Sequence, residues 1–154
     1  MSLFWHDGRF DTENAIKLAE VWVRIWQRRL WIPEWEVHVG ITPPEDHTGE
    51  HLASCNALPE YMYATIQLNP IQIWEEQSER DCERVVLHEL CHLVTARTRS
   101  IAYDRLAESE LELTRLVWQE LSAADEEAVE RIARQTWNAY DTTGGPHGTD
   151  VTAS

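Results

Sequence analysis

The pattern of apolar and polar positions first predicts a long helix near the N-terminus. Over residues 12–30 the apolar side chains recur every three or four positions, which places them on one helical face. That face comprises Ala15, Leu18, Trp22, Ile25 and Trp26. Asp11 or Thr12 can cap the start of this helix, and Pro33 requires it to end soon after Leu30.

Three stretches after this helix alternate between apolar and polar residues, which is typical of half-buried strands. They cover residues 35–41, 51–57 and 62–68, and the alternation is weakest in the second of them. Residues 42–46 are rich in proline and acidic residues and predict a loop. Asn69-Pro70 ends the third strand, because proline cannot donate to a sheet ladder.

The remaining pattern predicts three helices, over residues 78 to about 98, 104–121 and 122–140. The last of these begins with a capping-box-like sequence from Ser122 to Asp125. Helix, three strands and three helices, without a repeat or a linker, predict one α+β domain over residues 1–141. Residues 142–154 have no apolar period and are expected to form a disordered tail.

Composition and charge narrow the possible partners. The 154 residues include 43% hydrophobic residues and eight tryptophans, enough for a packed core. With 13 Lys and Arg against 27 Asp and Glu, the net charge is −14, which disfavours binding to nucleic acid or to an anionic membrane. No apolar run is long enough to span a membrane, and the N-terminus does not resemble a secretory signal.

The three cysteines form an odd set, Cys55, Cys82 and Cys91. If Cys82 and Cys91 share a helix, their nine-residue separation places them about 13.5 Å apart, beyond the reach of a disulfide. Reduced thiols in a cytoplasmic protein are the simplest interpretation.

One motif points to chemistry. His88-Glu89-Leu90-Cys91-His92 has the form H-E-x-x-H, in the middle of the longest predicted helix. Residues four apart on a helix differ by only about 40° in direction, so the two histidines can bind one zinc ion. Glu89 points about 100° away from His88, where it can act as the general base toward a water at the metal.

The residues around the motif favour this interpretation over two incidental surface histidines. Val85-Val86-Leu87 precede the motif and Leu93-Val94 follow it, so the helix is expected to be buried. Burying two imidazoles and a carboxylate without partners costs several kcal/mol, and a metal ion removes that cost.

The ten residues from Val85 to Val94 resemble the active-site helix of the zincin metallopeptidases. The layout from about residue 12 to 140 is similar to small single-domain metallopeptidases of phage and bacterial genomes, although only these ten residues are specific. The resemblance implies a zincin-like fold, a zinc cofactor on His88 and His92, and Glu89 as the catalytic base. The only later histidine is His147, so a carboxylate third ligand, as in gluzincins, is expected.

Two glutamates compete for the position of third ligand. On the last predicted helix Glu126 and Asp125 both lie within about 60° of the apolar face centred on Val129. On the preceding helix Glu110 lies about 60° from Leu113. Helical geometry alone leaves both glutamates open; the resemblance favours Glu126, because related proteins carry a glutamate three residues before an apolar position.

The sequence thus predicts a zinc metallopeptidase that acts on a peptide or protein substrate. The strand at residues 61–68 is expected to be the sheet edge that pairs with the extended substrate. Arg97 and Tyr103 are weaker candidates for polarising a substrate carbonyl, and His51 is expected to be an ordinary surface or strand histidine. The alternatives are a non-catalytic zinc-binding phage or regulatory module, and a zinc amide hydrolase with a non-peptide substrate.

Overall fold

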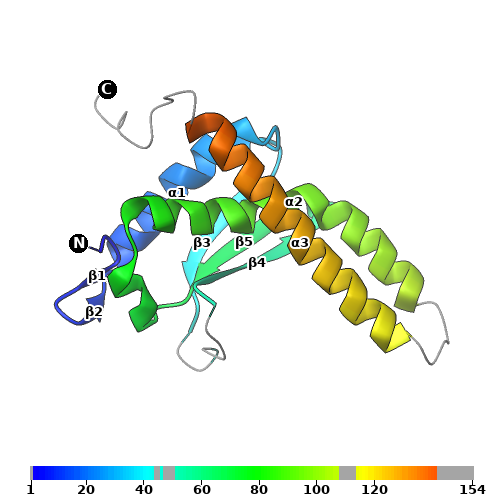
Figure 1. The fold of residues 1–154 in the computed structure, drawn as a ribbon, viewed down its shortest axis with the longest axis horizontal. Helices are drawn as coiled ribbons and strands as arrows, with labels where there is room; N and C mark the ends of the chain where they lie inside the picture. Colours follow the sequence, from blue (N-terminus) through cyan, green and yellow to red (C-terminus); the bar gives the residue numbers. More distant parts are fainter. Residues whose placement is uncertain (1, 44–45, 47–50, 108–113, 142–154) are drawn as a thin grey trace.

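The computed structural model describes residues 2–43, 46, 51–107 and 114–141 of the chain (Figure 1). They form an α+β fold with three long helices, a two-stranded sheet and a three-stranded sheet. In chain order the elements are β1 (Trp5–His6), β2 (Arg9–Phe10), α1 (Thr12–Arg29), β3 (Glu36–Ile41), β4 (Ala53–Leu58), η2 (Pro59–Tyr61), β5 (Tyr63–Leu68), η3 (Gln72–Glu76), α2 (Glu79–Ala107) and α3 (Thr114–Asp141).

The three-stranded sheet has the order β3-β5-β4, with β5 parallel to β3 and antiparallel to β4. The register aligns small and apolar residues in rows across the sheet, such as Val39, Ile66 and Cys55. Because side chains alternate between faces, these rows form one apolar face, while Ser54 and its neighbours form a polar one. The expected edge strand at residues 61–68 is therefore wrong: β5 is the central strand, and β4 is an edge.

Helices α1 and α2 cover the apolar face of this sheet, with α1 against β3 and α2 against β4. The tryptophans of the core, including Trp22, Trp26 and Trp74, are almost fully buried among them. Helix α3 packs on α2, and Trp137 of α3 stacks on Trp26 of α1. Figure 1 shows α3 crossing in front of α2.

The predicted start of the first two helices is confirmed by their caps. Asp11 accepts a hydrogen bond from the backbone N–H of Asn14 at 3.1 Å and so caps α1. Ser78 and Asp81 bond each other's backbone N–H groups at the start of α2, which is a reciprocal capping box. The hairpin of β1 and β2 was not predicted, because its strands are only two residues long.

The prediction of two helices after the motif helix is wrong. Helix α2 continues to Ala107, and α3 runs from Thr114 to Asp141 without a break at Ser122. No glycine or proline interrupts residues 114–141, so the serine of the apparent capping box is an exposed residue of the helix interior. The residues between the helices, 108–113, and the expected tail, 142–154, lie outside the described part of the chain.

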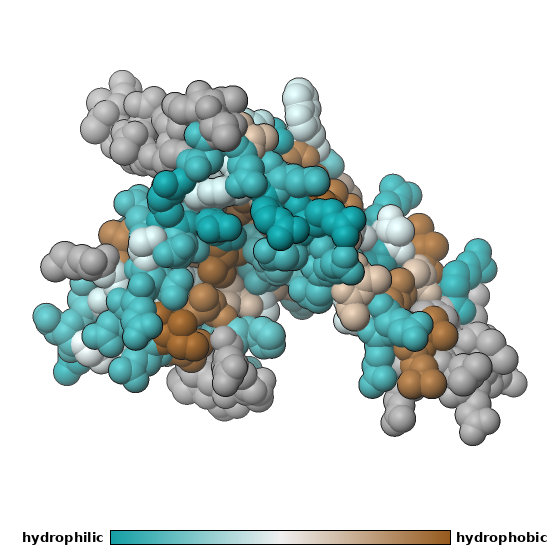
Figure 2. Space-filling view, in the orientation of Figure 1, coloured by the Kyte–Doolittle hydropathy of each residue, from teal (hydrophilic) through white to brown (hydrophobic). Residues whose placement is uncertain are grey.

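The C-terminal end of α2 and the start of α3 extend beyond the sheet (Figure 1). Figure 2 shows apolar side chains on this extension, in addition to smaller apolar patches on the mostly hydrophilic main body. Its exposed apolar residues are Ile101, Leu116 and Val117. No described helix is long and apolar enough to cross a membrane.

Candidate metal centre

Helix α2 carries the H-E-x-x-H motif at its centre, where the helix lies between β4 and α3. The imidazole centroids of His88 and His92 are 5.2 Å apart, as expected for residues one helical turn apart. His92 and Glu89 are buried, and His88 is partly exposed. The buried surroundings expected from the apolar flanks are confirmed at Val86, Leu87 and Leu93, whereas Val94 is exposed.

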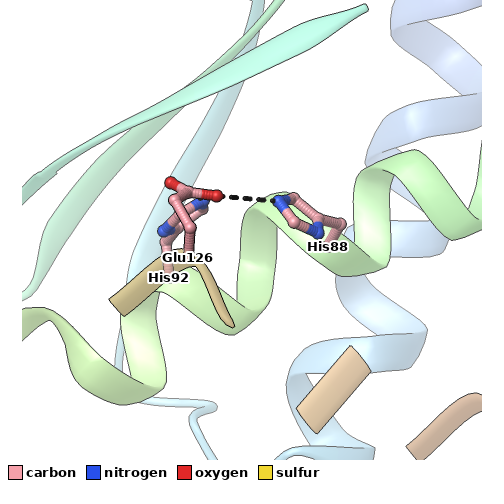
Figure 3. Close-up of side chains that lie close together, drawn as sticks. All are labelled: His88, His92 and Glu126. Carbon is pink, nitrogen blue, oxygen red and sulfur yellow. Dashed lines mark ion pairs between the residues drawn. The ribbon is translucent and has the colours of Figure 1, made fainter. Parts of the chain in front are cut away.

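Helix α3 brings Glu126 to the two histidines (Figure 3). Its Oε1 lies 3.5 Å from Nε2 of His92, and its Oε2 lies 3.6 Å from Nε2 of His88. One donor atom from each of the three residues lies within 4.8 Å of the others, so the group could hold a metal ion. Glu110, the alternative third ligand, lies outside the described residues.

The two nitrogen–carboxylate distances, which involve the two different oxygens of Glu126, are compatible with ligands of one metal ion. Two ligand atoms at about 2.0–2.1 Å from a zinc ion, at a tetrahedral angle, are about 3.3 Å apart. The Nε2–carboxylate distances of 3.5 and 3.6 Å are close to that value. Two imidazoles and one carboxylate also match the donor sets of catalytic zinc sites, in which three protein ligands leave one position open.

The opposite nitrogen of each imidazole faces a second carboxylate of α3. His88 Nδ1 lies 3.2 Å from Oε2 of Glu130, within hydrogen-bond distance. His92 Nδ1 is buried without a hydrogen-bond partner among the described residues, and Oδ2 of Asp125 lies 3.8 Å from it. A carboxylate at Nδ1 favours the tautomer that leaves Nε2 free to bind a metal ion.

Arg99 of α2 fixes the position of Asp125. Its Nη1 donates to Oδ2 of Asp125 at 3.0 Å, and the aspartate side chain is only 10% exposed. Glu130, by contrast, is 60% exposed. The carboxylate near Nδ1 of His92, that of Asp125, is therefore held by Arg99, whereas the carboxylate near Nδ1 of His88, that of Glu130, is in contact with solvent.

Glu89 lies beside the three candidate ligands, with Oε2 4.0 Å from Nε2 of His92. Burial, and to a lesser extent the charge of Glu126, raises the pKa of Glu89 to about 8. Burial lowers the pKa of His92, which favours the neutral imidazole that metal ions require. A carboxyl group whose pKa lies near neutral pH, beside the candidate metal ligands, can exchange protons with a bound water or substrate.

The group opens onto the edge strand β4. A cavity of about 270 Å³ is lined by Ala53, Ser54 and Cys55 of this strand and by the motif residues, with Glu126 and Arg99 on its other side. It adjoins a second cavity of about 370 Å³, toward the start of β4, to which His88 and Glu89 also contribute. His51, expected to be an ordinary histidine, is exposed and lines both cavities.

The structure thus brings together His88, Glu89, His92 and Glu126, the four residues named from the sequence. It does not bring Tyr103 to them: the Tyr103 ring stacks on Trp118 at a centroid distance of 4.0 Å, and Arg97 is exposed. No role was predicted from the sequence for Glu130, Arg99 or His51. The four-residue spacing of Glu126 and Glu130 repeats that of the two histidines, and this signal could have identified Glu130.

Comparison of the chain with protein-family models, curated proteins and solved structures found no match.

Proposed function

We propose that the protein is a zinc-dependent hydrolase of the zincin type that cleaves peptide bonds. One observation carries the proposal: a single carboxylate, that of Glu126, lies 3.5–3.6 Å from the Nε2 atoms of His88 and His92, with buried Glu89 alongside. A purely structural zinc site has four protein ligands and no use for a fifth acidic group. Glu89 therefore favours catalysis over the alternative of a non-catalytic zinc-binding module.

His88, His92 and Glu126 would hold the zinc ion in this proposal. When bound, the ion supplies Lewis-acid chemistry and lowers the pKa of a coordinated water toward about 7. Glu89 takes a proton from the attacking water and delivers it to the amine that leaves the peptide bond. Burial of Glu89 suits this role, because a weakly acidic carboxyl group both accepts and returns a proton near neutral pH.

The edge strand β4 is the proposed seat for the substrate backbone. One edge of β4 pairs with β5, its other edge pairs with no described strand, and Ala53, Ser54 and Cys55 of β4 line the cavity at the motif. An extended peptide can pair with a free strand edge, which aligns its carbonyl groups in a fixed register. Fixing the scissile bond next to Glu89 in this way supplies much of the rate enhancement of such enzymes.

Zinc content and peptide cleavage of matched variants test the proposal. Wild-type protein dialysed against zinc is expected to retain about one ion per chain and to cleave members of a mixed peptide library, read by mass spectrometry. Glu89→Gln is expected to retain zinc and lose cleavage, because an amide cannot accept the proton. His92→Ala is expected to lose both.

Three results would contradict the proposal in different ways. Absence of stoichiometric zinc binding would refute the metal centre itself. Zinc binding without cleavage of any peptide would favour the non-catalytic module, or an amide hydrolase if a non-peptide amide is cleaved. Full cleavage activity in Glu89→Gln would show that another group is the base.

A further inference from the structure

The larger cavity beside the candidate metal centre contains two arginines. Arg84 of α2 and Arg134 of α3 line it, together with His88, Glu89 and Glu130 at the metal end. Its remaining walls are mostly apolar, from Leu52, Ala53, Val85, Leu87, Ala133 and Trp137. The cavity is about 370 Å³, within the size range of small-ligand sites.

The two arginines lie at a defined distance from the candidate ligands. Arg84 precedes His88 by one helical turn, about 6 Å along the axis of α2. Arg134 follows Glu130 by one turn of α3, and Glu130 lies opposite His88. Because the two helices pair in opposite directions, both arginines lie one turn beyond the His88–Glu130 contact, on the same side of it.

Neither guanidinium forms an ion pair with a carboxylate in the described part of the chain. The Arg84 guanidinium carbon lies 5.6 Å from the centroid of Trp137, which is itself buried. Arg131, three residues before Arg134 on α3, does not line this cavity and pairs with Glu127 at 2.7 Å. The carboxylate of Asp81, whose pKa is lowered by its hydrogen bond with Ser78 and to a lesser extent by the charge of Arg84, is close to Arg84 without forming an ion pair with it. The cavity therefore presents two guanidinium groups that form no ion pair among the described residues, in a chain with a net charge of −14.

We infer that this cavity binds a carboxylate of the substrate, on the C-terminal side of the bond that is cleaved. The side depends on how the substrate pairs with β4, and the proposal takes the antiparallel pairing. Leu52 lines only the arginine cavity, Ser54 and Cys55 line only the cavity at the metal end, and Ala53 lines both. A substrate antiparallel to β4 therefore runs from the metal centre toward the arginines. Guanidinium groups bind carboxylates through paired charge-assisted hydrogen bonds.

The carboxylate has two possible sources, an acidic side chain or the chain terminus of a short peptide. In either case the negative charge lies beside Arg84 and Arg134, which are one helical turn from His88 and Glu130 at the metal end of the cavity. Glu130 does not compete for the arginines in the structure, since its carboxylate is engaged by Nδ1 of His88. This inference rests on the proposed function, and it adds the charge class of the substrate.

The test uses cobalt-loaded protein and three succinyl hydroxamates of equal size. The first carries a carboxylate on a side branch and an amide at its end, the second has these groups exchanged, and the third has amides at both positions. The hydroxamate binds the metal, and the change in the visible absorption of cobalt gives each dissociation constant without any turnover. At least one anionic probe is expected to bind about tenfold more tightly than the diamide, and the tighter of the two identifies the source.

Matched variants assign the preference to the two arginines. Arg84→Gln and Arg134→Gln are each expected to reduce the preference to about threefold or less, and the double variant is expected to abolish it. Arg131→Gln removes the same charge outside the cavity and is expected to retain the full preference. All the substituted residues are exposed, and thermal melting of each variant checks the fold.

The outcomes separate this inference from the proposed function. Equal binding of all three probes to wild-type protein, or a preference that survives in the double variant, would overturn the carboxylate site and leave the metal centre intact. Failure to bind cobalt at all would refute the proposed function, and the carboxylate site with it.

Discussion

The carboxylate behind His92 is expected to control metal affinity more strongly than the one behind His88. Asp125→Asn keeps the size of the side chain and removes its charge, 3.8 Å from Nδ1 of His92 and 3.0 Å from Nη1 of Arg99. Loss of such an outer partner of a metal-binding histidine weakens metal affinity about 10- to 100-fold. Asp125 lies beyond hydrogen-bond distance of His92 and acts on it through its charge, but it is only 10% exposed, so water cannot easily replace it and a loss of about tenfold, the lower end of that range, is expected.

Glu130→Gln is the matched comparison. Its carboxylate is closer to an imidazole, at 3.2 Å, but is 60% exposed. Exposed ion pairs contribute about 0.2–1 kcal/mol, so the loss of affinity is expected to stay below about fivefold. Burial rather than distance therefore decides the predicted order of the two variants.

Competition with a chromophoric chelator measures the zinc affinity of both variants. Glu127→Gln is the control, because this exposed residue pairs only with Arg131 among the described residues. The metal-free Asp125→Asn protein is also expected to lose about 1–2 kcal/mol of unfolding free energy, since Arg99 loses its charged partner. Wild-type zinc affinity in Asp125→Asn, or a larger loss in Glu130→Gln, would refute this reasoning.

Three further predictions test the assignments made above. Glu126→Ala is expected to lower zinc affinity by at least about tenfold, and unchanged affinity in the chelator assay would return the third-ligand position to Glu110. Ser122→Pro is expected to cost about 3 kcal/mol in urea unfolding, because it interrupts the interior of α3, whereas Ser122→Ala should be nearly neutral; a neutral proline would instead support a helix start at this position. Burial raises the pKa of all three cysteine thiols to about 12, so negligible thiolate is expected at pH 8. Ellman's reagent should then label the native protein slowly and the protein in guanidinium completely, and rapid native labelling would contradict the burial.

The sequence by itself determined the local features of this protein. Apolar periodicity and capping residues identified α1, the three strands of the larger sheet and the start of α2, because these signals act within a few residues of one another. Helical geometry likewise placed His88 and His92 on one face with Glu89 beside them. The break expected at Ser122 was wrong. Residue types that cap helices also occur on exposed helix surfaces, and the packing of α3 on α2 keeps α3 continuous through this position.

Only the tertiary structure decided which distant residues meet. The order of the strands depends on long-range pairing, so alternation alone could not show that β5 is central and that β4 is the edge beside the motif. The choice of Glu126, and the positions of Asp125 and Glu130, follow from the antiparallel packing of α3 on α2, which sets the register between residues about forty positions apart. The pairing of Arg84 and Arg134 at one cavity has the same origin, since side chains on two helices become neighbours only after the helices pack.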